Sequence, residues 1–339
     1  MSNKAVFHFF LLIFLCACGG QVPPDATPDI ITEKTLHDTD DPAIWVHPEN
    51  PAQSVIFGTD KDTDGAIYAF GLDGKVIENK TLRNLKRPNN VDIEYGFAIN
   101  DSVSTDIMVF TERERNQIRI FSVPDMKPLD QGGVPVFKDE KNPDYRLPMG
   151  ISLYKSPIDQ AVYAFVGRKS GPATGYIYQY VLESKGNGSL SARLVRKFGK
   201  FSGKKEIEAI AVDDLNGFVY YADEGVCIRK YHADPALGNE EISCFGGEYF
   251  EQDIEGIALT TWPESENYLI VSDQQRNQFN IFSARDNSFV KSINLGTVDT
   301  DGCEVTTIGL GTRFPNGLFV AMHNEREFFF YDLKMLGLP

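Results

Sequence analysis

A repeat of about fifty residues runs through this chain and limits the folds that are open to it. Similar patterns stand around Arg115-Asn116-Gln117 and around Arg276-Asn277-Gln278, and each is followed by a β-rich segment that ends in phenylalanine. A period of this length indicates a repeat array and not a single α/β domain. The aromatic residues that close the six copies are Phe70, Phe121, Tyr180, Tyr231, Phe282 and Tyr331.

Each copy contains at least three short apolar segments with turn residues between them, which predicts antiparallel strands. Four strands in about fifty residues are the usual content of a propeller blade, so the sequence predicts an all-β, six-bladed β-propeller. Residues 30–36 are β-prone and precede the first copy, so we expect this N-terminal strand to complete the last blade. A long β-sandwich or two β-domains would be the alternative, but sandwiches do not keep one register over six copies.

The N-terminal residues are expected to lie outside the propeller. Lys4 precedes an apolar stretch at 5–15 that is too short to span a bilayer, and Leu15-Cys16-Ala17-Cys18 follows. This pattern resembles a bacterial lipoprotein signal, which implies a signal at 1–18 that ends at a lipidated Cys18. We expect a flexible tether at 19–29 and a single propeller domain at 30–339.

An ordinary cleaved secretory signal is the alternative to the lipoprotein signal, and both interpretations export the protein. The lipidated form would be held in a bacterial membrane, in the periplasm or at the cell surface, and the cleaved form would be secreted. The formal charge of −15 and the pI near 4.8 argue against nucleic acid as a partner and indicate a cation-binding surface. We expect a monomer that contacts the membrane only through its lipid.

Three cysteines, Cys227, Cys244 and Cys303, remain in the exported part. Cys227 and Cys244 flank a turn-rich segment, so they either form a disulfide or remain as two buried thiols. The odd number leaves at least one free thiol. The spacing of cysteine and histidine does not suggest a zinc site.

Two sets of residues recur at fixed places in the repeat. The first set stands at the entrance to the first strand of each copy, an edge that lies beside the central channel of a propeller. Carboxylates that converge there would repel one another unless cations lay among them. This first set consists of Asp41, Asn89, Met149, Glu208, Glu255 and Asp301.

The second set follows the next strand and is basic on one side and acidic on the other. A basic arc beside carboxylates suits a metal-assisted phosphoryl site, because cations hold phosphate oxygens while carboxylates hold the metal. Ordinary solvated loop charges are the alternative. The basic members are Lys61, Arg113, Arg168 and Lys169, and the acidic members are Asp223 and Glu224.

Calcium is the metal that the available ligands favour, since they are hard oxygen donors. Residues 60–65 copy the opening of a calcium loop, but Gly71 stands where an EF-hand has its last glutamate. The segment is therefore a β-hairpin whose turn is either plain or a structural calcium site. Residues 299–302 are a shorter version with the same two possibilities.

Two long motifs resemble the signatures of the β-propeller phytases, also called alkaline phytases. Asp38-Thr39-Asp40-Asp41-Pro42-Ala43-Ile44-Trp45-Val46-His47-Pro48 follows the first signature, and Asn89-Asn90-Val91-Asp92-Ile93 follows the second. The resemblance continues through 253–256 and 299–302 to 317–321. It implies a calcium-dependent 3-phytase that releases phosphate from inositol hexakisphosphate (phytate), or from its calcium complex, by attack of metal-bridged water.

The resemblance also implies roles for individual residues. The alignment allows Arg115 in place of Arg113, and Glu224 in place of Asp223. Asp41 and Asp92 would bind calcium or hold a loop. The expected catalytic residues are Lys61, Arg113, Lys169 and Glu208; the phosphate-binding residues are Lys61, Arg113, Arg168 and Lys169; the calcium ligands are Asp41, Asp92, Glu208, Asp223, Glu224, Asp253, Glu255, Asp299 and Asp301.

The chain departs from the family pattern at several positions. Glu94 replaces an arginine, Met149 a tyrosine, and Ser170 an acid, which bears on a second phosphate subsite and on the number of calcium ions. A six-bladed calcium lactonase or esterase is one alternative function, but it would not need the basic arc. A non-catalytic, lipid-anchored binding propeller is another, and it would bind calcium without turnover.

Overall fold

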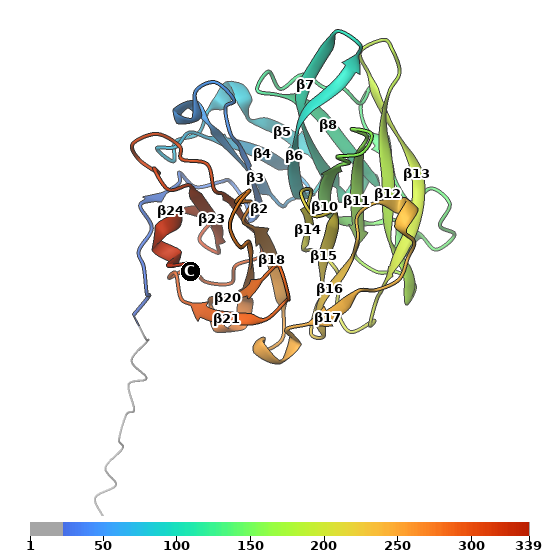
Figure 1. The fold of residues 1–339 in the computed structure, drawn as a ribbon. Coiled ribbons are helices and arrows are strands. Elements are labelled where there is room, and N and C mark those ends of the chain that lie inside the picture. Colours follow the sequence, from blue (N-terminus) through green and yellow to red (C-terminus); the bar gives the residue numbers. More distant parts are fainter. Residues whose placement is uncertain (1–22, 339) are drawn as a thin grey trace, which may run out of the picture.

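Six antiparallel sheets of four strands form the six-bladed propeller that the repeat predicts (Figure 1). This computed structural model describes residues 23–338. The first strand of each blade lies innermost and contacts the first strands of both neighbouring blades. These six inner strands surround the central channel, so their side chains define what the channel can bind.

The blades follow one another along the chain, each built from consecutive strands except the last. Blade 1 is β2 (Thr39–Trp45), β3 (Val55–Asp60), β4 (Gly65–Phe70) and β5 (Leu82–Leu85); blade 2 is β6 (Pro88–Asn100), β7 (Val103–Glu112), β8 (Gln117–Val123) and β9 (Val134–Pro135); blade 3 is β10 (Pro148–Lys155), β11 (Val162–Arg168), β12 (Thr174–Ser184) and β13 (Leu190–Lys200). Blade 4 is β14 (Ile210–Asp213), β15 (Phe218–Asp223), β16 (Cys227–His232) and β17 (Ser243–Phe245); blade 5 is β18 (Ile254–Leu259), β19 (Tyr268–Asp273), β20 (Gln278–Ser283) and β21 (Phe289–Ile293); blade 6 is β22 (Cys303–Thr306), β23 (Leu318–His323), β24 (Glu327–Asp332) and β1 (Ile30–Ile31).

The helices of the described chain are short 3-10 turns between strands. None of them is long and apolar enough to cross a membrane. They are η1 (Pro51–Gln53), η2 (Glu78–Lys80), η3 (Arg113–Arg115), η4 (Pro143–Arg146), η5 (Pro235–Leu237), η6 (Gly247–Tyr249), η7 (Gln274–Arg276) and η8 (Leu333–Leu336).

The N-terminal strand closes the ring, as the sequence predicts. Ile30 and Ile31 of β1 pair with Phe330 and Phe329 of β24, and Figure 1 shows this blue segment beside the red C-terminal strands. The regular strand is shorter than the expected 30–36. The chain nevertheless continues along β24, since the amide of Thr32 donates to the carbonyl of Phe328 at 3.0 Å. The N-terminal segment is therefore held in blade 6 by backbone hydrogen bonds, and the chain that leads from it into β2 links blade 6 to blade 1.

The fold also takes in residues that we expected to belong to the tether. The amide of Asp25 donates to the carbonyl of Asn294 at 2.7 Å, and the amide of Asn294 donates to Asp25 Oδ2 at 2.8 Å. Ala26 packs against the core of blades 5 and 6. Part of the expected tether at 19–29 is thus bound to the propeller. The expected signal at 1–18, with Cys18, and residues 19–22 lie outside the described residues.

The closing aromatics of the repeat stand on the third strand of each blade and are all buried. They pack between neighbouring blades, as when Tyr178 and Tyr180 join the core shared by blades 2 and 3. Where such a residue carries a hydroxyl, the hydroxyl has a partner: Tyr331 donates to the carbonyl of Leu295 at 2.6 Å. Burying one such side chain contributes about 1.5–3 kcal/mol, so a blade gains this stability only with its neighbours in place.

Cys227 and Cys244 form a disulfide, which decides between the two alternatives that the sequence left open. The bridge joins the third and fourth strands of blade 4. Cys303, on the inner strand of blade 6, is buried and free. The bridge therefore ties the outermost strand of blade 4 to its neighbour.

Candidate active site

A charged cavity of about 480 Å³ lies where the inner strands of the blades begin. Carboxylates and lysines dominate its wall, and they come from blades 1, 3, 4, 5 and 6. We call it the rim cavity. It is lined by Lys61, Lys169, Lys205, Glu206, Glu208, Glu224, Asp253, Glu255, Gln274 and Asp301.

Lys61 directly follows β3 and contacts two carboxylates. Its Nζ lies 3.0 Å from Asp40 Oδ1 and 3.0 Å from Asp301 Oδ2. Burial opposes the charge of Lys61, but Asp40, Glu208 and Asp301 outweigh it and raise the pKa of the ammonium group. Lys61 therefore stays protonated and holds blades 1 and 6 together at the cavity wall.

Asn89 connects two of the carboxylates below the rim. This fully buried amide donates from Nδ2 to Asp40 Oδ2 at 3.0 Å and to Glu208 Oε1 at 3.3 Å. Burial and the nearby charge of Asp40 raise the pKa of Glu208 well above its ordinary value. The first recurring set thus converges on the axis in blades 2 and 4, as predicted.

The opposite wall of the cavity contains two further lysine–carboxylate pairs. Lys205 pairs with Asp253, and Lys169 pairs with Glu206. Gln275 also donates to Asp253, from Nε2 to Oδ2 at 2.6 Å. All three lysines of the cavity therefore contact carboxylates, which partly neutralise their charge.

The carboxylates still outnumber the lysines in this wall by six to three. Burial, followed by repulsion from Glu206, raises the pKa of Glu224 to about 8, and burial with the charge of Asp40 raises that of Asp301 to about 7. Burial and the charges of Glu224 and Glu208 raise the pKa of Glu255 as well. Each shift means that burial and the neighbouring carboxylates outweigh the positive charge that acts on the anionic form.

The donor set fits calcium, which binds hard oxygen ligands in irregular geometry. Glu255 Oε2 and Glu224 Oε1 are buried and have no hydrogen-bond partner among the described residues, so a cation would satisfy them. Within residues 23–338, no three acidic, histidine or cysteine side chains already surround one point as metal ligands. The lysines that hold Asp253 and Asp301 would have to move for such a site to form.

Arg113 is partly buried and does not line the rim cavity. One of its terminal nitrogens contacts Met149 Sδ, and its Nε has no hydrogen-bond partner in the described chain. Burial lowers the pKa of Arg113, while Glu208 opposes that effect. Met149, where the family pattern has tyrosine, thus packs against the arginine and is itself buried.

Three residues of the second set do not line the rim cavity: Arg113, described above, and Arg168 and Asp223. Arg168 is fully buried, and its guanidinium donates to Glu140 at 2.8 Å and to the carbonyls of Tyr176 and Gly175, both at 2.9 Å. Asp223 is equally buried and accepts two hydrogen bonds from Arg229, at 2.9 and 2.7 Å. Arg168 and Asp223 are both bound to partners inside the blades. They therefore belong to the framework of the propeller and not to the rim cavity.

Neighbouring residues face the cavity instead. Lys169 and Glu224 each follow one of these buried residues in the chain and line the rim cavity. Successive side chains point to opposite sides of an extended chain. Only one residue of Arg168 and Lys169, and only one of Asp223 and Glu224, can therefore face the cavity. Of the two acids that the sequence allowed here, the structure brings Glu224 into the site.

Asp41, Asp92 and Asp299 also lie away from the rim cavity. Asp41 and Asp92 line a second cavity further along the channel. Asp299 is exposed and accepts a hydrogen bond from Asn324 Nδ2 at 2.9 Å. Residues 60–65 form the turn of the predicted hairpin. In this turn Asp62 Oδ1 accepts a hydrogen bond from the backbone amide of Asp64 at 3.0 Å.

Three residues at the site were not singled out from the sequence: Asp40, Lys205 and Glu206. Asp40 had a detectable signal, because it stands four residues before Ile44, as Asp301 stands four before Val305. Lys205 and Glu206 lie in the loop just before Glu208. Their positions depend on how that loop folds, which the repeat does not specify.

Comparisons with known proteins agree with the fold and with the motifs. The phytase family model matches residues 20–327. The 3-phytase of Bacillus subtilis (strain 168) is 31% identical over 301 residues, covering 84% of this chain and 74% of that protein. Kuenenia stuttgartiensis hydrazine synthase is similar in fold alone, with a TM-score of 0.51, 9% identity and coverage of 86% and 83% of the two chains. The chain thus belongs to the phytase family and is a homologue of a 3-phytase.

Proposed function

We propose that this protein is a calcium-dependent phosphomonoester hydrolase that releases phosphate from phytate. The observation that carries the proposal is the composition of the rim cavity, in which six carboxylates and three lysines share one wall. Family membership supports the substrate, and the hard oxygen donors support the metal.

The charges in the rim cavity explain why a cation is needed. Phytate is a dense polyanion, and a chain with a net charge of −15 repels it. Lys61, Lys169 and Lys205 cannot overcome this repulsion, because carboxylates pair with all three. Cations held by the surplus carboxylates would invert the local field and free the lysines for phosphate.

Five carboxylates of the rim cavity would hold calcium: Glu208, Glu224, Asp253, Glu255 and Asp301. When bound, calcium supplies positive charge that polarises phosphate oxygens and promotes ionisation of water. Lys61 and Lys169 would bind phosphate oxygens from two sides of the cavity. Arg113 would stabilise charge from below, next to Glu208. Asn89 orients Glu208 through its hydrogen bond at 3.3 Å.

The test is phosphate release from phytate by the purified protein at mildly alkaline pH, with calcium titrated and then chelated. Release should rise with calcium, disappear with chelator and fall strongly in Glu208→Gln. Glu248→Gln is the matched control, since Glu248 is exposed and lies outside the site. Full activity with all calcium chelated would contradict the calcium dependence, and calcium binding without phosphate release would favour a binding propeller.

We also propose that the protein is exported and anchored through a lipid on Cys18. The signal-like sequence supports this, and so does the disulfide between Cys227 and Cys244, because such bonds persist in oxidising compartments. Mass spectrometry of the N-terminal peptide from membranes should show diacylglycerol on Cys18. A Cys18→Ser variant that remains in the membrane fraction with unchanged processing would contradict the proposal.

A further inference from the structure

A second cavity, of about 500 Å³, continues the channel beyond the rim cavity. Asp40 contacts Lys61 of the rim, whereas the next residue, Asp41, lines this second space. The same change occurs between Glu208 and Ala209, and between Glu255 and Gly256. The two cavities therefore follow one another along the inner strands. We call the second one the channel cavity.

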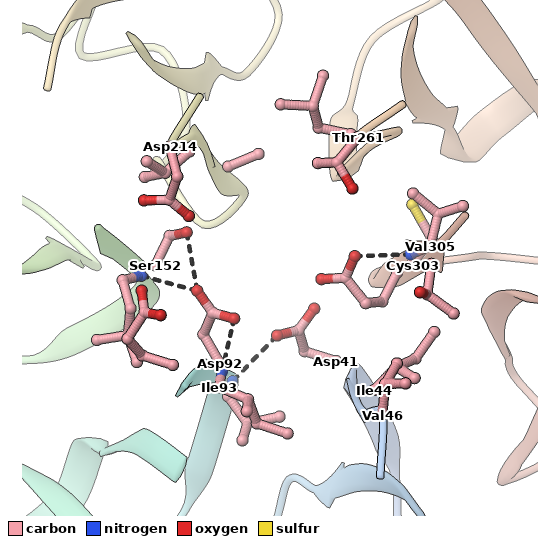
Figure 2. Close-up of a pocket in the computed structure, with 18 of the residues that line it drawn as sticks. Asp41, Ile44, Val46, Asp92, Ile93, Ser152, Asp214, Thr261, Cys303 and Val305 are labelled. Carbon is pink, nitrogen blue, oxygen red and sulfur yellow. Dashed lines mark hydrogen bonds between the residues drawn. The ribbon is translucent and has the colours of Figure 1, made fainter. Parts of the chain in front are cut away.

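The channel cavity combines aliphatic walls with carboxylates. The aliphatic side chains come from the inner strands of several blades and include Ile44, Val46, Ile93, Ile151, Ile257 and Val305. Five acids interrupt them: Asp41, Asp92, Glu94, Asp214 and Glu304. Figure 2 shows Asp41, Asp92 and Asp214 directed toward the middle of the cavity from different blades. Phosphate hydrolysis as proposed above uses none of these side chains.

Backbone amides fix the position of every one of these carboxylates. Because the amides belong to the strands themselves, the carboxylates cannot gather around one small ion without losing these bonds. The amide of Val91 donates to Asp41 Oδ2 at 3.0 Å, Leu153 to Asp92 Oδ2 at 2.7 Å, Tyr95 to Glu94 Oε1 at 2.7 Å, Lys155 to Asp214 Oδ1 at 2.9 Å and Val305 to Glu304 Oε1 at 2.6 Å.

The remaining oxygens are available to a ligand. The second oxygens of Asp41, Glu94, Asp214 and Glu304 have no hydrogen-bond donor within the described part of the chain. His47 is the one basic side chain among the described residues that line this space. The ammonium group of Lys155 donates to the carbonyl of Tyr95 at 2.8 Å and forms no hydrogen bond with Glu94 among the described residues.

Asn90 gives an independent indication of a ligand. It lines the channel cavity, is only 6% exposed, and its Oδ1 is enclosed with no hydrogen-bond partner in the described residues. Buried amides are nearly always hydrogen-bonded, since an unsatisfied one costs stability. A ligand with hydrogen-bond donors in the channel would satisfy this oxygen once the Asn90 side chain turned toward it.

We propose that the channel cavity binds a linear diamine or polyamine. Ammonium groups would donate charge-assisted hydrogen bonds to the fixed carboxylates and to Asn90. The methylene groups between them would lie against the aliphatic walls and be removed from water. A compact divalent ion matches this arrangement less well, because it requires six to eight oxygens around one point.

Spermidine titrated into the purified protein by calorimetry, at pH 8.5 and physiological salt, tests the proposal. We expect saturable binding and a higher Tm with spermidine. In the double variant Glu94→Gln and Glu304→Gln, the Kd should rise at least about tenfold, since two charge-assisted hydrogen bonds are lost. The control variant Glu240→Gln and Glu248→Gln makes the same charge change at two exposed positions and should bind normally.

A series of diamines of increasing chain length separates a built site from loose attraction to an acidic protein. Binding in the channel should pass through an optimum length, whereas surface attraction depends on charge alone. Equal affinities in the channel and control variants would overturn the proposal. Calcium that binds in the channel, with the amines excluded, would overturn it as well. These measurements use binding and stability, so they do not depend on phosphate release.

Discussion

Lys61 and Asp301 form an ion pair at 3.0 Å, although 240 positions separate them in the chain. Lys61 follows the second strand of blade 1, and Asp301 precedes the inner strand of blade 6. The pair therefore bridges blades 1 and 6, the two blades that are also linked because the chain runs from β1, paired with β24 in blade 6, into the first strand of blade 1. Ring closure and assembly of the rim cavity thus depend on the same junction.

Replacing Lys61 should affect both activity and stability. In Lys61→Met, phosphate release should fall about 100–1,000-fold, as is typical when a charge-stabilising group is removed from an active site. The Tm should also fall, because Asp40, only 1% exposed, loses its cationic partner. Lys75→Met, at an exposed position, should change neither. A phytate assay and thermal unfolding would check this, and an active Lys61→Met would exclude the assigned role.

Asp223 and Glu224 should respond differently to the same chemical change. Asp223→Asn removes the carboxylate that accepts two hydrogen bonds from Arg229 and leaves this buried arginine with Glu241 alone, so it should cost about 3 kcal/mol of unfolding free energy. Glu224→Gln should leave stability unchanged or improve it, since its carboxylate has no cation in contact, but should raise the calcium concentration needed for activity. Denaturant unfolding and calcium titration would distinguish them. The opposite pattern would return the ligand role to Asp223.

Arg168 and Lys169 form a second contrasting pair. Arg168→Lys cannot replace the hydrogen bonds to Glu140, Tyr176 and Gly175, so it should lower the Tm while any residual folded enzyme keeps its KM. Lys169→Ala removes an exposed lysine from the rim cavity and should raise the KM for phytate with little change in Tm. An unchanged KM in Lys169→Ala would exclude it from phosphate binding.

The calcium-free protein should become less stable as the pH rises from about 5 to 8. Burial raises the pKa of Glu94 to about 8 and that of Glu304 to about 8, above the ordinary value of 4.5. Between these values the folded state binds more protons than the unfolded state, so the free energy of unfolding decreases with increasing pH. Above the folded pKa values this contribution no longer changes.

Thermal unfolding across this pH range would measure the effect. Glu94→Gln and Glu304→Gln should each make the decline of Tm shallower, because the side chain no longer titrates. Glu248→Gln, at an exposed position, should keep the slope of the native protein. A slope unaffected by either channel variant would mean that other groups control the pH dependence.

The sequence by itself determined the architecture. The period of the closing aromatics corresponds to the third strand of every blade, and the β-prone N-terminal segment pairs with Phe329 and Phe330 as predicted. These features can be predicted from the sequence because each blade repeats one local pattern, and because a blade buries its aromatic side chains only against neighbouring blades. The sequence also placed Glu208 and Glu255 at the entrance to the inner strands and Lys61 after the second strand, because these positions recur in the repeat, and all three line the rim cavity.

Only the tertiary structure decided which member of each charged pair faces the site. Asp40 and Asp41, Arg168 and Lys169, or Asp223 and Glu224 are nearly equivalent by position and charge. Their side chains nevertheless point to opposite sides of an extended chain, and burial with a partner such as Arg229 commits one of them to the scaffold. The channel cavity could not be predicted from the sequence either, because its five carboxylates come from four different blades. Residues so far apart in the chain meet only when the ring closes, because the packing of the blades around the axis sets their distances.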